Sequence, residues 1–446
     1  MDQDIIQEEI FSGGQSFADF SVLGAIIDEV QHLDPGDKLK RSSFLEDHKN
    51  TQQRHILKKQ LKVLLDVFER VDSIEGTTKA IEAECDKLST ILERNTWTIL
   101  KKCRELERSY SSLSLYFENT GSSQVDNLVL MNAAIEQLTD IDNTRFIDFA
   151  AKLLSDCFDR LELGSSFSMI VIPGYMYSSY SGYNRLDVPI AIWGKIAHQN
   201  KALLITDFRD MDLAADVTDL IKDSGHFGKE NFRSNIIMTC NYLLGRRCYE
   251  DWGEDEDLYV PGSAALAGRI YNMPVARPVS VKTMGNMKAT QAVHFDIRLN
   301  ELLSLEGFGL VTMINKSGKV RPYSNRTLYS GHSAGLKKYS TVRLLHHISK
   351  VLIDIINRTA FEAWTSATQQ GLMLRIMKFL NGIQGHEMLI RNFRLIRYER
   401  ELDKLNVPIL YLEISFELTG SKDFRLNLQS SMGSGSYEWS SEYSEL

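Results

Sequence analysis

Proline is nearly absent from the first third of this chain. The first 170 residues hold a single proline, Pro35, and the whole chain of 446 residues holds 8. Because proline interrupts helices, this stretch can form long helices with hardly a break. From Gln52 to about Asn119, apolar residues recur at helical spacing in two stripes separated by a break near Gly76. We expect a helical hairpin or a partner-binding helical arm here, since so narrow a stripe needs a cover.

Each stripe consists of six aliphatic or aromatic residues on one helical face. The first holds Ile56, Leu57, Leu61, Leu64, Leu65 and Phe68, and the second holds Ile81, Leu88, Ile91, Leu92, Ile99 and Leu106. A shorter apolar helical face precedes them within residues 17–30, formed by Val22, Leu23, Ile26, Ile27 and Val30. It ends at the turn Asp34-Pro35-Gly36. We therefore divide this part into an N-terminal segment, 1–50, with a short amphipathic helix, and a helical arm, 51–120.

After a loop at 119–123, the pattern becomes mixed. Short runs rich in β-forming residues predict strands at 168–173, 202–206, 309–314 and 407–418. Helical patterns lie between and after them, at 187–200, 234–244, 341–361 and 366–382. This order predicts an α/β (α+β) fold, with a mixed twisted sheet and helices packed on it.

The end of the chain alternates apolar and polar residues. The run 407–418 alternates strongly, and the turn 419–422 leads into a second alternating run at 424–429. The core therefore spans 121–429 and ends in paired strands. The remaining residues, 430–446, are rich in Ser, Gly and Glu and are expected to form a flexible tail.

Composition excludes several classes of protein. The net charge of -8 argues against non-specific binding to nucleic acid or to anionic membranes. No run of about 18 apolar residues exists, and the acidic start MDQDIIQEEI is unlike a signal peptide. The 5 cysteines are scattered, which is typical of a reducing compartment. We expect a cytoplasmic protein without membrane insertion.

The sharpest enzymatic motif is Gly331-His332-Ser333-Ala334-Gly335, a G-x-S-x-G pattern. A nucleophile elbow needs a buried strand directly before the serine, whereas the residues at 321–326 are polar. His346, His347 and His386 follow as nominal bases. A loop of small residues is the simpler interpretation, and a serine hydrolase using Ser333 is a remote alternative.

Other motifs for metals, phosphates and nucleic acids are weaker. No metal-ligand spacing stands out, and the acidic run 250–257 is read as a solvated loop. No GxxxxGK phosphate loop is present. We expect no cofactor. Arginines recur every third residue from Arg391 to Arg400, interleaved with apolar residues, which indicates a basic edge that favours an acidic protein partner over nucleic acid.

Several stretches in succession resemble one family. They are FRSNIIMTCNYLLGRRCYEDWGEDED at 232–257, LYVPGSAALAGRIYN at 258–272, NELLSLEGFGLVTM at 300–313, KALLITDFRD at 201–210, the segment 325–361 and the paired strands at the end. The chain resembles contractile sheath proteins of phage tails and of type VI secretion systems. Within that group it is most similar to the large sheath subunit, the TssC/VipB family, in a divergent Bacteroidetes-like form. The helical arm at 52–119 is unusually long and charged for that family.

The resemblance implies a structural protein and no enzyme. Such a subunit assembles with a small sheath subunit (TssB/VipA-like) around an inner tube (Hcp-like), in hexameric rings stacked in a helical sheath. A baseplate and a AAA+ unfoldase (ClpV-like) that recycles the sheath are further implied partners. Terminal strands of one subunit complete a sheet in its neighbours, which suits alternating strands that would otherwise be exposed. A hairpin buried in its own domain is the alternative.

The resemblance also suggests three sets of contact residues. The strand-exchange set is Leu410, Leu412, Ile414, Phe416, Phe424, Leu426 and Leu428. The candidates for facing the tube are Arg343, Lys350, Arg375 and Lys378, for which a solvated helix face is equally plausible. The candidates for binding the small subunit are Leu23, Ile26, Ile27, Leu61, Leu64 and Phe68. A phage tail or an extracellular contractile injection particle, whose sheath usually has one component, remains the alternative machine.

Overall fold

The computed structural model divides the chain into two compact units, Met1–Lys101 and Lys102–Leu446. Helix α5 (Ile74–Thr120) contributes residues to both. The structure describes residues 59, 61, 62, 65, 66, 73–121, 125, 128–158, 166–176, 188–279, 285–358, 365–385, 389–402, 408–418, 423–432 and 437–445.

A five-stranded sheet forms the centre of the second unit. Its strands are β1 (Met169–Val171), β2 (Leu203–Asp207), β3 (Ile236–Cys240), β6 (Leu310–Lys316) and β7 (Lys319–Pro322), in the order β1-β2-β3-β6-β7. The first four run parallel and β7 pairs antiparallel with β6. Every residue of β2 and β3 is buried, as expected of parallel strands that are covered on both faces.

Helices cover both faces of this sheet. Successive residues of a strand point to opposite faces, so neighbouring residues pack against different helices. Leu204 packs in one apolar cluster and Leu203 in the other. The first cluster includes side chains of α7 (Arg145–Phe158), α8 (Val188–Gln199), α9 (Ala214–Ser224) and α11 (Leu299–Gly307). The second includes side chains of α10 (Gly262–Asn272), α12 (Tyr339–Asn357) and the end of α5. The short helices α6 (Ile135–Thr139), η3 (Asn231–Asn235) and η4 (Glu250–Trp252) complete the connections.

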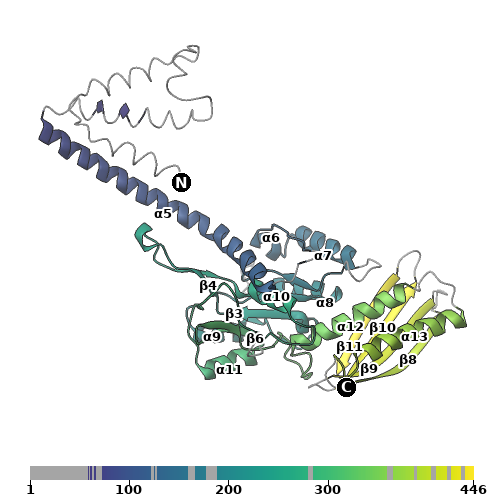
Figure 1. The fold of residues 1–446 in the computed structure, drawn as a ribbon. Coiled ribbons are helices and arrows are strands. Elements are labelled where there is room, and N and C mark those ends of the chain that lie inside the picture. The colour runs from purple at the N-terminus through teal and green to yellow at the C-terminus, as the bar shows by residue number, and fades with distance from the viewer. Residues whose placement is uncertain are drawn as a thin grey trace, which may run out of the picture. The chain divides into compact units, whose positions relative to one another are not determined.

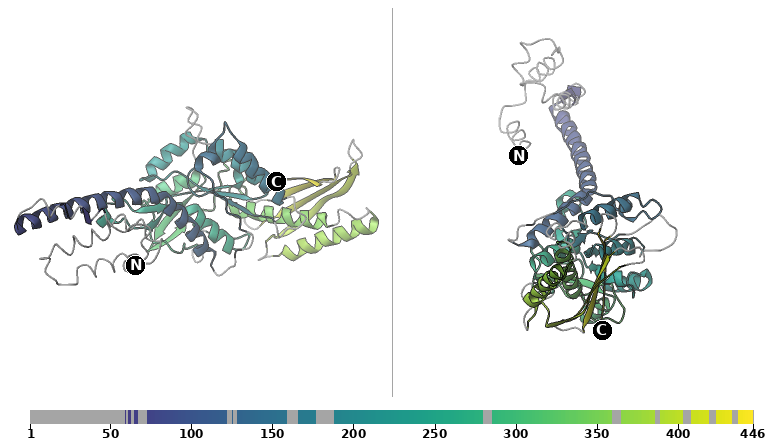
Figure 2. Two further views of the ribbon diagram at one scale, coloured as in Figure 1. Left: turned by 90° about the horizontal axis from the view of Figure 1, so that it is seen from above. Right: turned by 90° about the vertical axis from the view of Figure 1, so that its right-hand side faces the viewer.

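A second sheet lies at the C-terminal end. Its strands are β8 (Asn392–Leu402), β9 (Pro408–Glu417), β10 (Phe424–Met432) and β11 (Tyr437–Glu445), in the antiparallel order β11-β10-β9-β8. Helices α12 and α13 (Ser366–Ile383) lie on the same side of it (Figures 1 and 2). A two-stranded ribbon of β4 (Leu243–Arg246) and β5 (Leu258–Val260) extends the fold beside α10.

The predicted fold class is confirmed, and so are the predicted helices at 187–200, 341–361 and 366–382, within a few residues. The helix predicted at 234–244 is wrong, because β3 and β4 occupy that stretch. An apolar run this short does not distinguish a fully buried strand from a helix by periodicity. The stretch forms a strand at the centre of the sheet, where every residue of β3 is buried.

Two boundaries also differ from the sequence prediction. The tail predicted as flexible contains β11, which forms nine ladder pairs with β10, from Phe424↔Glu445 to Met432↔Tyr437. Backbone pairing stabilises a strand whose composition alone would not. The predicted core boundary at 121 falls too late, because Leu115 and Tyr116 of α5 belong to the core cluster.

Two features are absent from the described residues. No helix there is long and apolar enough to cross a membrane. In the same residues, no three His, Cys, Asp or Glu side chains gather where they could hold a metal ion.

Candidate functional site

The seven residues of the strand-exchange set lie together on one face of the C-terminal sheet. All of them are buried, from Phe416 and Phe424 at 0% exposed to Leu410 at 8%. They pack in the same cluster as Leu372, Ile376 and Leu380 of α13. Burying each such side chain contributes about 1.5–3 kcal/mol, so they form a substantial core. β9 and β10 are therefore the inner strands of the sheet, and the edges among the described strands belong to β8 and β11.

The edge strand β8 carries the arginines that recur every third residue. Arg397 forms ion pairs with Glu399 at 2.9 Å and with Glu401 at 2.5 Å, and its guanidinium lies over the ring of Tyr411. A register shift between Leu395 and Arg397 interrupts the pairing with β9. Bulges and charges of this kind are how edge strands avoid uncontrolled pairing.

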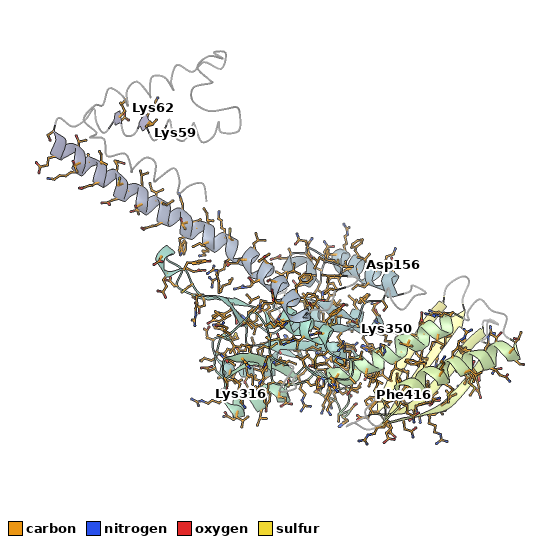
Figure 3. The ribbon with its side chains drawn as sticks, in the orientation of Figure 1. Lys59, Lys62, Asp156, Lys316, Lys350 and Phe416 are labelled. Carbon is orange, nitrogen blue, oxygen red and sulfur yellow. The ribbon has the colours of Figure 1, made fainter. Side chains whose placement is uncertain are left out.

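Two of the four candidate tube-facing residues, Lys350 and Arg343, donate hydrogen bonds to backbone oxygens of the same chain. Lys350, which is labelled in Figure 3, is 8% exposed. It donates a hydrogen bond to Phe167 O. Burial lowers the pKa of its ammonium group to about 7. Arg343 donates to Met273 O at 3.0 Å, and burial lowers the pKa of its guanidinium to about 10.

The other two residues, Arg375 and Lys378, line an open groove between α12 and α13. The groove has a volume of about 600 Å³, and its remaining lining residues are Ile355, Arg358, Phe379, Gly382 and Ile383. Arg358 forms an ion pair with Asp354 at 2.8 Å. Arg375 and Lys378 are exposed, and no ion pair is recorded for either with another described residue. The groove thus combines an apolar lining with the exposed positive charge of Arg375 and Lys378.

Most of the candidates for binding the small subunit, namely Leu23, Ile26, Ile27, Leu64 and Phe68, lie outside the described residues. Leu61 is described and is half-buried. The second predicted stripe lies on α5, which is one continuous helix of 47 residues. Four of its members in the first unit, Leu88, Ile91, Leu92 and Ile99, are 54–67% exposed. These large apolar side chains are exposed in series along the helix among the described residues.

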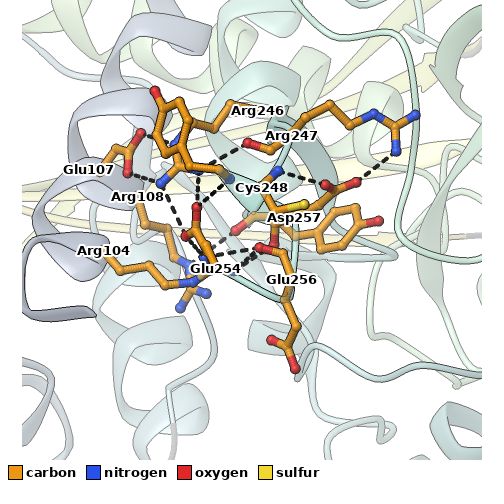
Figure 4. Close-up of polar contacts among 11 residues, drawn as sticks. Arg104, Glu107, Arg108, Arg246, Arg247, Cys248, Glu254, Glu256 and Asp257 are labelled. Carbon is orange, nitrogen blue, oxygen red and sulfur yellow. Dashed lines mark hydrogen bonds and ion pairs between the residues drawn. The ribbon is translucent and has the colours of Figure 1, made fainter. Parts of the chain in front are cut away.

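An ion-pair cluster fastens the end of α5 to the ribbon of β4 and β5 (Figure 4). Arg246 bonds both oxygens of Glu107, with Nη2 2.8 Å from Oε2, and donates to Glu254 at 2.6 Å. Arg104 of α5 also pairs with Glu254. Hydrogen bonding to Glu107 raises the pKa of Arg246, and bonding to Arg246 lowers the pKa of Glu254. Within the acidic run predicted as a solvated loop, Glu254 and Asp257 are thus partly buried and ion-paired with arginines, whereas Glu250, Asp251, Asp255 and Glu256 are exposed as predicted.

Ser333 of the G-x-S-x-G motif lies in the loop before α12 and is 8% exposed. Its hydroxyl accepts a hydrogen bond from Leu336 N at 3.2 Å, which closes a local turn. His346 is engaged elsewhere, with Nε2 3.2 Å from the hydroxyl of Tyr443. His386 lies outside the described residues. The arrangement is that of a structural loop.

Two polar residues of the core escaped the sequence analysis. Asp207, at the end of β2, accepts hydrogen bonds from Gly174 N at 2.8 Å and Ser263 N at 2.9 Å, and from the hydroxyls of Thr239 and Ser263. It joins β1, β3 and the start of α10. The aspartate directly after the apolar run LLIT was the available signal. Tyr443 lies in residues 430–446, whose Ser-, Gly- and Glu-rich composition predicted a flexible tail and not a buried strand.

Comparison with known families gives three matches in order along the chain. The TssC/VipB-like N-terminal region matches residues 8–96. The central domain of type VI secretion system TssC/VipB matches 98–330, and the TssC/VipB-like C-terminal domain matches 338–445. The central domain alone covers more than half of the chain.

Solved structures of low sequence identity are also similar. The sheath tail protein of Desulfitobacterium hafniense is 11% identical with a TM-score of 0.42, over 68% of this chain and 60% of that chain. The sheath tail protein of Listeria innocua is 13% identical with a TM-score of 0.41, over 69% and 60%. A chain of the anti-feeding prophage baseplate is 14% identical with a TM-score of 0.47, over 69% and 76%. The chain spans about three fifths of the length of the two sheath tail proteins. A search of curated proteins found no match.

Proposed function

Since this chain belongs to the TssC/VipB family of type VI secretion proteins, we propose that it is the large subunit of a contractile sheath that works in the cytoplasm. It assembles with a small TssB-like subunit into stacked hexameric rings around an Hcp-like inner tube, and contraction propels the tube out of the cell. The family match, in which three regions follow one another in order, carries this proposal. A baseplate starts assembly, and a ClpV-like AAA+ unfoldase recycles the contracted sheath.

The C-terminal sheet suits strand exchange between subunits. The seven buried residues of β9 and β10 anchor an inner hairpin under α12 and α13. That hairpin leaves β8 and β11 at the two edges, where strands of neighbouring subunits can add by backbone pairing. Such connections keep a lattice joined while the bodies of the subunits move.

Two further surfaces suit the other partners. The groove with Arg375 and Lys378 offers positive charge to the inner tube. The exposed stripe of α5, with Leu88, Ile91 and Leu92, offers an apolar face to the small subunit, together with the N-terminal candidates Leu23, Ile26, Ile27, Leu61, Leu64 and Phe68.

Co-expression tests the proposal. The chain is produced alone and with each neighbouring gene product, and the lysate is sedimented at high speed. Pelleting that requires a small second protein supports a two-component type VI sheath. Pelleting of the chain alone would instead favour a phage tail or an extracellular contractile injection particle, and a chain that never pellets would contradict both.

A further inference from the structure

The last strand, β11, has a sequence that barely defines its own register. Residues 437–445, YEWSSEYSE, contain no aliphatic or β-branched side chain. Register is weakly specified in such strands, because a shift by two residues returns each position to the same face. Backbone pairing with β10 is regular over nine ladder pairs and would be nearly as complete after a shift of two. Something other than the backbone must select the register.

One side chain of β11 enters a buried polar site. Tyr443 is 6% exposed, and its hydroxyl lies 3.2 Å from Nε2 of His346 on α12. The same nitrogen lies 3.2 Å from the amide nitrogen of Asn235. Asn235 in turn donates to Ala202 O at 2.9 Å, and its oxygen lies 2.9 Å from Nδ1 of His198. Tyr443 is thus one member of a chain of hydrogen bonds that reaches the central sheet.

Two buried lysines neighbour His346 at this site. Lys350 lies one turn beyond His346 on α12, and Lys201 precedes β2; both are buried. Burial lowers the pKa of Lys201 to about 8, and the neighbouring Glu442 opposes that shift. We call the group formed by His198, Lys201, Asn235, His346 and Lys350 the cradle. Its imidazole and amide groups fit a strand that presents a tyrosine hydroxyl, as β11 does at Tyr443.

We propose that the contact of Tyr443 with the cradle sets the register of β11 against β10. A shift by two residues would bring Ser441 or Glu445 to the place of Tyr443. Serine is too short to fill the volume of a phenol ring, which leaves a cavity and a buried imidazole without its tyrosine partner. Glutamate would place a carboxylate where a neutral ring is now enclosed. A single buried polar contact that fixes register is known from coiled coils, where a buried asparagine serves this purpose.

The proposal extends to which strand can occupy this edge. A strand from another chain would have to present tyrosine at the same register to satisfy the cradle. The position beside β10 is therefore selective for a strand with tyrosine at this register, whereas backbone pairing alone would accept any strand.

Cysteine crosslinking in the full-length chain reads the register directly. Gln429 lies opposite Ser440, so Gln429→Cys with Ser440→Cys reports the native register. Gln429→Cys with Glu438→Cys reports the register in which residue 441 replaces residue 443 at the cradle. Both pairs lie away from Tyr443, and peptide mass spectrometry separates the new disulfide from any that the native cysteines form.

Three variants of each pair test the proposal. Tyr443→Phe removes only the hydroxyl, and we expect the ratio of native to shifted crosslink to fall about tenfold. Exchanging the two residues, Ser441→Tyr with Tyr443→Ser, keeps the composition and should transfer most of the crosslink from position 440 to position 438. Tyr398→Phe is the control, because it removes a tyrosine hydroxyl that donates to Gln369 O at 3.0 Å from the opposite edge strand. It should leave the ratio unchanged.

An exchanged chain that still crosslinks at position 440 would overturn the proposal, since the tyrosine would then not determine the register. An equal ratio in Tyr443→Phe, Tyr398→Phe and the parent chain would overturn the role of the hydroxyl.

Discussion

Arg246 of β4 meets Glu107 of α5 in a two-bond ion pair, with Nη2 2.8 Å from Oε2. The Arg246 side chain is 16% exposed and also pairs with Glu254, which is 10% exposed. Because these charges are shielded from water, they interact more strongly than surface pairs. The contact fixes the last turns of α5 to the ribbon of β4 and β5.

Replacement of Arg246 should therefore cost stability. Arg246→Met leaves Glu107 without its ion-pair partner and Glu254 with Arg104 alone, and we expect the free energy of unfolding to fall by about 1–3 kcal/mol. Urea unfolding followed by circular dichroism measures it. Arg247→Met is the matched control, since that side chain is 79% exposed in its pair with Asp257 and should lose less than about 0.5 kcal/mol. Equal losses in the two variants would show that the buried cluster adds nothing.

A second prediction concerns the close packing of α5 against α10. A Cβ added to Gly268 would collide with the backbone oxygen of Tyr116. Gly268→Ala should force the two helices apart and lower the free energy of unfolding by about 1–3 kcal/mol.

Gly371→Ala provides the control for Gly268. Gly371 lies in α13, where an added Cβ meets nothing within 4 Å. Alanine favours helix over glycine, so this variant should gain about 0.5–1 kcal/mol. A loss in Gly371→Ala similar to that in Gly268→Ala would contradict the packing argument.

The free energy of unfolding should rise with pH because of two buried groups of the cradle, Lys350 and His346. Burial lowers the pKa of Lys350 to about 7, with Lys201 as a second cause, and it lowers the pKa of His346 well below 6.5. The unfolded chain binds protons at these groups up to pH of about 10.4 for lysine, while the folded chain has released them, so raising the pH favours the folded state. Between pH 7.5 and 9.5, Lys350 alone should add up to about 1.4 kcal/mol per pH unit.

Lys350→Met removes this titration and should flatten the dependence of the unfolding free energy on pH. Lys195→Met is the control, because Lys195 is exposed on α8 and should leave the slope as it is. The measurement is urea unfolding at several pH values. The same slope in the Lys350 variant and in the parent chain would contradict the assignment.

The sequence predicted the parts of the fold that repeat a strong local pattern. The alternation at 407–418 identified β9, and the apolar spacing at 341–361 identified α12. It failed where tertiary contacts decide. β3 is apolar throughout because both of its faces are covered, so no alternation marks it as a strand. β11 is rich in Ser and Glu, and pairing with β10 together with Tyr443 places it.

The candidate contact residues show the same limit. Sequence alone did not distinguish Lys350 from Lys378, since both are cations on predicted helices. The structure separates them: Lys350 is buried and donates to Phe167 O, whereas Lys378 lines the open groove. Whether a cation on a helix is buried depends on which elements pack against that helix. The spacing of apolar residues in the sequence does not show this.

Charge reversal in the groove tests its proposed role against the inner tube. The groove is open and its cations are exposed, so Arg375→Glu with Lys378→Glu should leave the unfolding free energy within about 0.5 kcal/mol of the parent value. We expect sheaths that still form with the small subunit but retain at most about a tenth of the inner tube protein on purification. Lys316→Glu with Lys319→Glu, two exposed residues at the turn between β6 and β7, is the control for charge alone and should retain the tube. Full retention of the tube by the groove variant would rule out this contact.

Electron microscopy of purified material tests the central claim most directly. The chain is co-expressed with its small partner and examined in negative stain. The account predicts hollow, striated tubes that require both proteins. Single particles of uniform size under every condition, with or without the partner, would contradict the assignment of this chain to a contractile sheath.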